Sequence, residues 1–322
     1  MDSDSAPKNQ VSNTFAVQAC ESGQKLLMLL DRHLHLPPKL LHRWIRTGQV
    51  RKNGGRCQPF ERVNEGDVIR LPPFAPKMAR QSGASPMPNI ALPPVAGKCA
   101  GITCYVKPAG LPTHGGTGHL DSLASRLQQS FATSPFVPVP AHRLDRETSG
   151  LILVAETFLD LKKIQEEIRT RTLLKDYLCW VEGVWEYDGP ILLDSMLARL
   201  ENSVGPKMEV VSGGAAAKFA ESLIVPLKVL DKCSLLLVRI LTGRTHQIRV
   251  QLAKVKHPIV GDVRYGYRED GQSMLLHSTR ITLSDGTQFF NLPDWKDIYA
   301  VDQIPDLTVV DREAKIAKIV KI

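Results

Sequence analysis

The sequence HRLDRETSG, residues 142–150, runs directly into the apolar stretch LILVA at residues 151–155. A buried strand needs few polar residues ahead of it, yet this segment brings an imidazole, two guanidinium groups and the carboxylate of Asp145 to its start. Loops fixed to a rigid sheet commonly carry active-site residues. The segment therefore predicts either a catalytic loop or an ion-pair network around Asp145.

Two further clusters carry side chains that suit the same site. In GRTHQIRV, residues 243–250, helical spacing places Arg249 off the apolar face, where it reaches either a site or solvent. In KDY, residues 175–177, strand alternation puts Lys175 and Tyr177 on one face. Taken alone, Tyr177 fits a packing residue as well as a functional one.

The pattern between residues 99 and 300 mixes strands and helices. Strands are expected at 102–106, 151–155, 173–181 and 235–241, and helices at 120–129, 158–169 and 245–255. Because strands and helices do not alternate strictly, we expect an α+β domain with a mixed, mainly antiparallel sheet.

The positive charge of the chain is concentrated near its N-terminus. The whole chain has a net charge of +8, and residues 22–80 alone hold twelve basic and four acidic side chains, an excess of eight. A basic module attached to a neutral domain indicates a polyanionic partner such as nucleic acid. The alternative is a basic surface that faces only solvent.

A short helix and a hairpin carry much of this charge. A helix expected at residues 39–47 has apolar residues on one face and basic residues on another, Gly48 is placed to end it, and Asn53-Gly54 predicts a tight turn. The basic residues expected to contact RNA here are Lys39, Arg43, Arg46, Arg51 and Lys52. The stretches LLHRWIRTGQVRKNGGR (40–56) and VNEGDVIRL (63–71) resemble the small S-four-like RNA-binding module first known from a ribosomal protein. The resemblance implies a small α/β unit.

The chain thus divides into five expected segments. They are a flexible N-terminus at 1–21, an S-four-like module at 22–71, a Pro-rich linker at 72–98, a catalytic domain at 99–300 and a C-terminal tail of unknown role at 301–322.

Several classes of protein and site are excluded by the sequence. Apolar residues make up 43% and charged residues 23% of the chain, which are ordinary globular values, and no apolar run is long enough to span a membrane. The first ten residues fit neither a signal nor a transit peptide, so we expect a cytoplasmic protein. No nucleotide-binding glycine loop, metal-ligand grouping or G-x-S-x-G motif is present, so we expect no cofactor and no metal.

Taken in order, the clusters resemble the motifs of the RluA-type RNA pseudouridine synthases. Beyond the three quoted above, HPIVGD (257–262), YG (265–266) and LLHS (275–278) follow at the expected places. The first motif of that family usually has an acid or Asn before KPAGL (107–111), where this chain has Val106. The S-four-like module is a common companion in the family.

The resemblance implies that the protein isomerises uridine to pseudouridine within structured RNA. It implies that Asp145 is the catalytic carboxylate, that Arg249 holds it ionised through a forked pair of hydrogen bonds, and that Tyr177 lies against the uracil. It also implies a flipped-out base, with Arg143 filling the gap it leaves and His142 beside it in the RNA-binding surface. Which step Asp145 performs stays open.

The expected partner is ribosomal RNA of the large subunit, because an added basic module gives extra grip on a large substrate. Two alternatives stay open, namely a synthase for transfer RNA and a non-catalytic RNA-binding or ribosome assembly factor with the same fold. Intact Asp145, Tyr177 and Arg249 disfavour the non-catalytic alternative, since such a factor has no physical need for all three.

Overall fold

The fold is taken from a computed structural model of the whole chain. It describes residues 13–34, 36–75, 77–78, 91–115, 121–132, 134, 136–201, 207–266, 273–301, 307–313 and 320–321. The backbone forms two compact units, the first made of residues 1–91, 127–139 and 156–162 and the second of residues 92–126, 140–155 and 163–322. Helices α4 (Leu123–Ser130) and α5 (Phe158–Thr170) contribute residues to both units.

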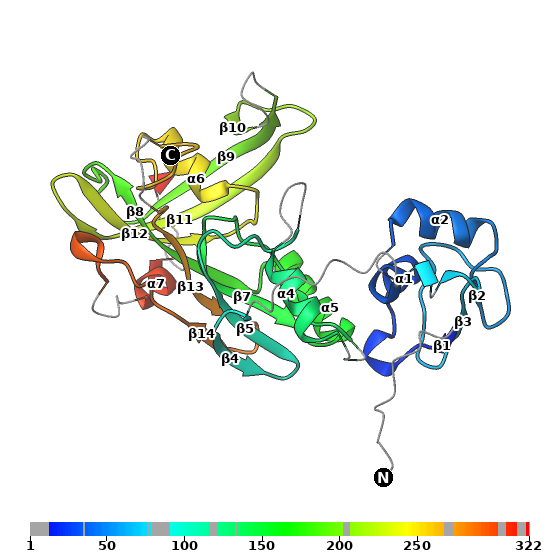
Figure 1. Cartoon of the computed structure of the whole chain (residues 1–322). Coiled ribbons are helices and arrows are strands. Elements are labelled where there is room, and N and C mark those ends of the chain that lie inside the picture. The colour runs from blue at the N-terminus through cyan, green and yellow to red at the C-terminus, as the bar shows by residue number, and fades with distance from the viewer. Residues whose placement is uncertain are drawn as a thin grey trace, which may run out of the picture. The chain divides into compact units, whose positions relative to one another are not determined.

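In the first unit, the described part of the N-terminal region forms two short helices and a small antiparallel sheet (Figure 1). Its elements are β1 (Thr14–Ala16), η1 (Ala19–Glu21), α1 (Leu26–Leu34), α2 (Pro38–Arg46), β2 (Arg51–Lys52) and β3 (Val68–Arg70). The strand order is β1-β3-β2. Helix α2 starts with Pro38 in its first turn and is followed by Gly48 at φ 74°, so the helix end lies where the sequence predicted it.

The burial pattern of α2 separates its two faces. Leu41, Trp44 and Ile45 are buried in the core of the unit, whereas the basic side chains on the other face are exposed. The predicted turn at Asn53-Gly54 is also present, with both residues at positive φ.

The segment expected to be a flexible N-terminus, residues 1–21, contains strand β1. Phe15 pairs with Ile69 in an antiparallel ladder, and Val17 is buried with the core of this unit. Residues 14–17 are therefore fixed by backbone hydrogen bonds and apolar burial, while residues 1–12 lie outside the described part of the chain.

The second unit is built on one large mixed sheet, which confirms the expected α+β class. Across the described residues this sheet has 12 strands, with the order β10-β9-β11-β12-β8-β13-β7-β5-β4, while β14 pairs with β13, β15 with β9 and β6 with β7. The central strands are β5 (Ile102–Lys107), β7 (Ser149–Ala155), β8 (Leu174–Glu182), β12 (Cys233–Ile240) and β13 (Leu276–Thr282). The others are β4 (Val95–Cys99), β6 (Val139–Pro140), β9 (Ile191–Leu200), β10 (Lys207–Val211), β11 (Lys218–Val229), β14 (Gln288–Phe290) and β15 (Val320–Lys321). Most pairs are antiparallel, whereas β13 pairs with β7 and β15 with β9 in parallel.

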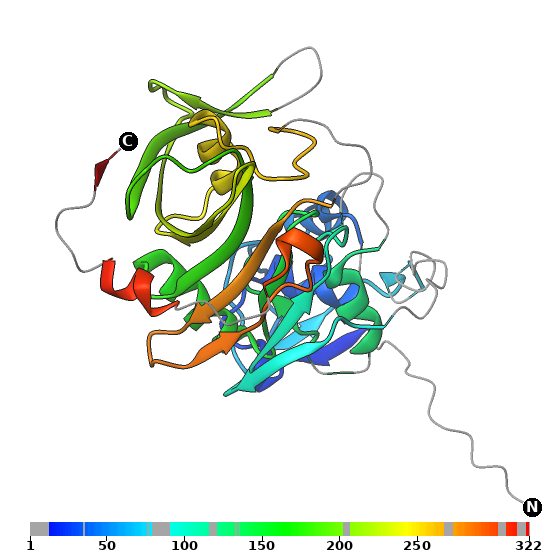
Figure 2. The same ribbon diagram turned by 90° about the vertical axis from the view of Figure 1, so that its left-hand side faces the viewer.

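Helix α6 (Gln247–Lys254) lies within the curve of the strands, as Figure 2 shows. The buried Gln251 fixes it there, because its amide donates to the carbonyl oxygens of Leu193 on β9 and Ala220 on β11. A polar side chain so deep in the domain is tolerated because its hydrogen bonds are made.

Both ends of the second unit extend beyond the expected boundaries. Strand β4 begins at Val95, inside the stretch 72–98 expected to be a linker, and pairs with β5; residues 79–90 of that stretch lie outside the description. The expected C-terminal tail contributes β15 and helix α7 (Thr308–Glu313). Val310 of α7 is buried in the core, and Asp311 pairs with Arg239 of β12, so the tail is part of the packed domain.

Candidate active site

A cavity of about 300 Å³ opens in the second unit between the loop before β7, strand β8 and the start of α6. It is lined by the predicted residues Asp145, Tyr177 and Arg249, together with His142, Arg143, Lys175 and His246. Three segments far apart in the sequence thus meet at one cavity, as the combination of motifs predicted. A volume of this size is at the lower end of the range of small-ligand sites.

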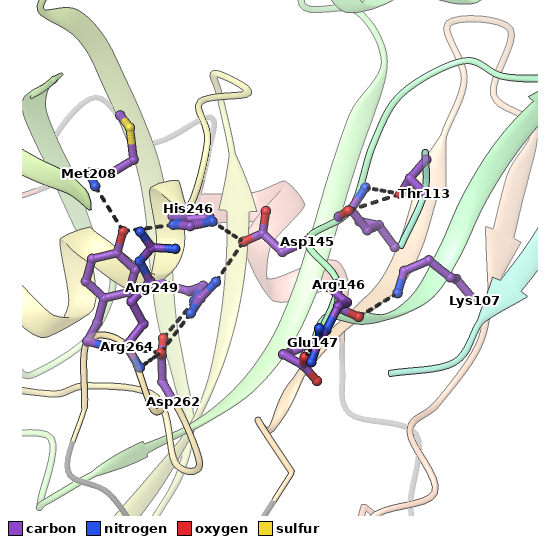
Figure 3. A network of polar contacts seen from close by, with 12 residues as sticks. Lys107, Thr113, Asp145, Arg146, Glu147, Met208, His246, Arg249, Asp262 and Arg264 are labelled. Atoms are coloured by element: carbon purple, nitrogen blue, oxygen red, sulfur yellow. Dashed lines mark hydrogen bonds and ion pairs between the residues drawn. The ribbon is translucent and has the colours of Figure 1, made fainter. Parts of the chain in front are cut away.

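The loop that carries Asp145 is fixed on both sides of that residue (Figure 3). On one side, the hydroxyl of Thr113 accepts from the N–H of Leu144 at 3.1 Å and donates to its carbonyl at 3.0 Å. On the other, the buried ammonium of Lys107 donates to the carbonyl of Arg146 at 3.1 Å. These bonds position the carboxylate before any substrate arrives.

Lys107, the first residue of KPAGL, holds this loop and its own segment through several hydrogen bonds. It also donates to the carbonyl oxygens of Pro108 and Leu111, both at 2.8 Å, and its burial lowers its pKa to about 8. The contact pattern is that of a backbone clamp, and it does not depend on the side chain of Val106.

Gly150 lets the catalytic loop join the sheet. It has a φ of 101°, and a Cβ at this position would lie 2.6 Å from the backbone nitrogen of Ser278 on the neighbouring strand β13. Glycine is therefore required at the end of the HRLDRETSG segment for β7 and β13 to pair.

Arg249 connects two carboxylates. Its Nε and Nη2 atoms donate to Asp262 at 2.7 and 2.8 Å, while Nη1 donates to Asp145 at 3.2 Å. The forked pair of hydrogen bonds expected for Asp145 is thus made to Asp262, and this expectation is corrected. Burial alone lowers the pKa of Arg249, but the two carboxylates raise it by more, so Arg249 stays charged.

Asp262 is the fixed anchor of this group. Its side chain is fully buried and also accepts from the backbone N–H groups of Arg264 and Tyr265. Burial raises the pKa of Asp262, but the hydrogen bonds from Arg249 and the backbone donors lower it by more, so the pKa lies below its usual value. In the sequence analysis Asp262 was part of the HPIVGD motif, with no role predicted for it.

His246 is a second charged or polar neighbour of Asp145, beside Arg249, and the sequence analysis did not single it out. It has a φ of 53°, rare outside glycine, and its Nε2 lies 3.8 Å from an oxygen of Asp145. Its Nδ1 lies 2.8 Å from the hydroxyl of Tyr265, and that hydroxyl accepts from the backbone N–H of Met208. When the hydroxyl of Tyr265 donates to Nδ1, neutral His246 carries its proton on Nε2, the nitrogen that faces Asp145 in Figure 3.

Electrostatics favour this neutral form. Burial lowers the pKa of His246 more than Asp145 raises it, and the nearby Arg249 lowers it as well. The ring of Tyr265 contacts two cations, with Lys207 at 4.8 Å and Arg249 at 5.1 Å from its centroid. Tyr265 therefore contacts both of the side chains that face Asp145, His246 and Arg249.

Tyr177 lies on β8 and is buried at the cavity. Burial and the nearby carboxylate of Asp145 raise its pKa, so its hydroxyl keeps its proton at neutral pH. The side chain can therefore present a ring and a hydrogen-bond donor to a ligand.

The other residues expected to contact RNA are distributed over both units. Arg143 is exposed and lines the cavity, whereas the ring of His142 accepts from the N–H of Leu153 at 3.1 Å and supports β7. Burial lowers the pKa of His142 to about 3, so the ring is neutral and offers RNA no positive charge.

In the first unit, the structure separates the expected RNA-binding cations into two groups. Lys39, Arg43 and Arg46 are exposed on α2, and Arg51 is half-buried. Lys52, in contrast, is paired with Glu61 at 2.5 Å and Asp67 at 3.6 Å, and the bond to Glu61 raises its pKa. The charge of Lys52 is thus already balanced within the unit.

The described residues contain no group of three or more His, Cys, Asp or Glu side chains that could hold a metal ion. None of the helices in the described ranges is long and apolar enough to cross a membrane.

Comparisons with known proteins agree with the fold and the motifs. The family described as RNA pseudouridylate synthase matches residues 101–254. Ribosomal large subunit pseudouridine synthase C of Yersinia pestis is 31% identical over 272 residues, 83% of each chain. The Escherichia coli K12 protein of the same name is 32% identical over 265 residues, 79% of this chain and 80% of the relative.

Solved structures show the same architecture. Human RNA Pseudouridylate Synthase Domain Containing 4 gives a TM-score of 0.53 at 22% identity, over 62% of this chain and 88% of that one. Human RNA Pseudouridylate Synthase Domain Containing 1 gives 0.52 at 23%, over 66% and 88%. The second unit thus has the pseudouridine synthase fold. The chain belongs to the RluA-type family of RNA pseudouridine synthases.

Proposed function

We propose that this protein isomerises uridines to pseudouridine in large-subunit ribosomal RNA and that Asp145 is its catalytic carboxylate. The observation that carries the proposal is the position of Asp145, held at a cavity of about 300 Å³ by a clamped loop and by Arg249 at 3.2 Å. Two curated relatives that match about four fifths of the chain carry that substrate in their names.

The reaction is an internal exchange of bonds. The bond between ribose C1′ and uracil N1 breaks, the uracil turns, and C1′ joins ring carbon C5. C5 loses its proton and N1 gains one, so there is no net oxidation or reduction. A carboxylate can serve such a sequence as nucleophile or as base. For either role, the hydrogen bond from Arg249 at 3.2 Å holds the carboxylate of Asp145 in place.

Uracil enters this cavity only after leaving the base stack. A stacked base is inaccessible, and flipping it out costs a few kcal/mol. Tyr177, which lines the cavity, is proposed to form an apolar wall for the flipped ring, with a protonated hydroxyl on the same side chain. Arg143, exposed beside Asp145, is the side chain proposed to occupy the vacated space.

The first unit is proposed to bind RNA away from the reacting base. Support comes from the exposed cations of α2 and from the concentration of the positive charge of the chain in residues 22–80. Contacts to phosphate supply affinity without sequence information. Residues 22–71 would thus increase the affinity for a large RNA, as the S-four-like resemblance implies.

The direct test is complementation in Escherichia coli cells that lack the pseudouridine synthase C relative. Pseudouridines in total RNA are mapped in cells carrying the unaltered protein, the Asp145→Asn variant or an empty vector. The proposal predicts that pseudouridine returns to large-subunit ribosomal RNA with the unaltered protein alone. Pseudouridine appearing only in transfer RNA would overturn the proposed substrate, and equal return with Asp145→Asn would overturn the proposed role of Asp145.

A further inference from the structure

Lys175 is a buried lysine at the cavity that the reaction as described leaves unused. It lies on β8 two residues before Tyr177, so both side chains are on the same face of the strand. Its residue exposure is 9%, and it lines the same cavity as Asp145 and Tyr177.

The ammonium of Lys175 has no partner among the residues that the structure describes: neither a hydrogen bond nor an ion pair is made by its Nζ atom. The adjacent carboxylate of Asp176 is on the opposite face of β8, where Arg239 and Arg280 bind it at 2.7 Å each. Burial lowers the pKa of Lys175 to about 8, which leaves it mainly charged at neutral pH. A buried charge is disfavoured unless something pairs with it. The ammonium of Lys175 is therefore available to pair with a ligand that enters the cavity.

The position of Lys175 selects the part of the substrate it meets. Lys175 lines the cavity from the same face of β8 as Tyr177, and Asp145 lines it from the loop before β7. Residues two apart on a strand are separated by roughly 7 Å along it. A uracil with its ribose end at Asp145 and its ring against Tyr177 therefore extends its far edge toward Lys175.

The phosphates of the RNA have other cations available at the same cavity. Arg143 is exposed and Arg244 is half-exposed, and both line the cavity. A backbone phosphate remains hydrated and nearer to solvent than the flipped base. The deep position of Lys175 thus fits the base better than the backbone.

We infer that Lys175 binds a carbonyl oxygen of the flipped uracil and stabilises the negative charge that the ring carries during isomerisation. The inference rests on the proposed function, since it takes Asp145 as the catalytic carboxylate and Tyr177 as the wall of the uracil site. Lys175 then acts as a catalytic residue that touches the reacting base.

The chemistry requires this charge on each route open to Asp145. When the C1′–N1 bond breaks, its electron pair stays on the uracil and spreads to the two carbonyl oxygens. If Asp145 instead adds to C6, the electron pair of the C5–C6 double bond moves to the carbonyl oxygen at C4. The bond from C5 to C1′ uses this electron pair. Loss of the C5 proton then returns negative charge to the ring until N1 is protonated. A fixed cation at the carbonyl edge favours both intermediates over the neutral ground state.

The test compares Lys175→Met, Lys175→Arg and the control Lys254→Met, which changes an exposed lysine at the end of α6 that is not part of the cavity lining. The substrate is large-subunit ribosomal RNA labelled with tritium at uracil C5, from Escherichia coli cells lacking the relative. Single-turnover tritium release, RNA affinity at several salt concentrations and thermal melting are measured for each protein.

The inference predicts that Lys175→Met lowers the single-turnover rate by about 10²–10³-fold, as the loss of one preorganised donor does, with less than about threefold change in affinity. Lys175→Arg, which keeps a cation, should retain more activity than Lys175→Met, and Lys254→Met should match the unaltered protein. The melting temperature of Lys175→Met should be unchanged or higher, because an unpaired buried charge is removed.

Three results would overturn the inference. An unchanged rate for Lys175→Met would remove any catalytic role. Weaker binding with a flatter salt dependence and a normal rate would assign Lys175 to a phosphate. A lower melting temperature together with the lower rate would assign it a structural role. Failure of the unaltered protein to release tritium would instead overturn the proposed function.

Discussion

Arg249 divides its guanidinium between two carboxylates, and double-mutant cycles should give unequal coupling energies for the two pairs. With Asp262 it makes a fork of 2.7 and 2.8 Å, and the side chains are 7% and 0% exposed. With Asp145, 17% exposed, it makes one bond of 3.2 Å. The pair with Asp262 should therefore dominate the stability that Arg249 confers.

The variants are Arg249→Met, Asp262→Asn, Asp145→Asn and the two doubles that contain Arg249→Met. Removing one partner of a buried pair costs about 3–5 kcal/mol, because the other charge is left unpaired. For Arg249 and Asp262 we expect a coupling energy of about 2–3 kcal/mol. For Arg249 and Asp145 we expect only about 0.5–1 kcal/mol, as for a partly exposed pair.

Urea unfolding at pH 7 measures all six proteins, including the unaltered one. The rate of pseudouridine formation gives the opposite ranking for the carboxylates, because Asp145→Asn should abolish it whereas Asp262→Asn acts only through the position of Arg249. A coupling energy for the Arg249–Asp145 pair equal to or larger than that for the Arg249–Asp262 pair would refute the claim that Asp262 is the main partner of Arg249.

Three further predictions concern separate parts of the molecule. The pKa of Lys175 in the folded protein, about 8, lies below the usual 10.5, so between these pH values the unfolded state binds more protons. The free energy of unfolding should therefore rise with pH over this range, by up to about 3 kcal/mol relative to Lys175→Met. An equal change for both proteins in urea melts at pH 7 and 10.5 would contradict this. Tyr265→Phe removes the hydroxyl that lies 2.8 Å from Nδ1 of His246, and single-turnover rates should fall about 5–10-fold, the equivalent of one neutral hydrogen bond. An unchanged rate would show that this contact does not support the reaction. Replacing the three exposed cations of α2 by Gln should reduce the slope of log affinity against log salt on ribosomal RNA by about 2, and an unchanged slope would separate α2 from RNA binding.

Much of the second unit follows from local sequence. The apolar run at 151–155 forms β7, and the lack of strict strand–helix alternation agrees with the observed mixed, mainly antiparallel sheet. The motifs also predicted that Asp145 and Arg249, 104 positions apart, lie in one site, and they do, at 3.2 Å. Local patterns succeed here because they reflect strand burial and a recurrent set of motifs.

The finer geometry depends on packing that sequence spacing does not determine. Which carboxylate receives the fork of Arg249 is decided by the loop holding Asp262, whose oxygens also accept two backbone N–H groups. The orientation of His142 toward β7 depends on the N–H of Leu153. The pairing of Lys52 arises from two acids that only the fold brings near it.

Elements at the ends of the expected segments show the same limit. The short strand β1 is stabilised by its ladder with β3, which is formed by residues more than 50 positions further along the chain. Strand β4 starts among prolines and glycine that suggest a linker, and it is a strand because β5 pairs with it. In both cases the partner strand, and not local propensity, determines the structure.

The role of Asp145 is tested most directly by one substitution, Asp145→Asn, which keeps the shape of the side chain and removes its charge. The measurement is tritium release from uracil C5 of labelled large-subunit ribosomal RNA under single-turnover conditions, with RNA binding measured in parallel. Asp145→Asn should bind RNA like the unaltered protein and release no tritium above background. Release at a rate close to that of the unaltered protein, with equal binding, would contradict the assignment of Asp145 as the catalytic carboxylate.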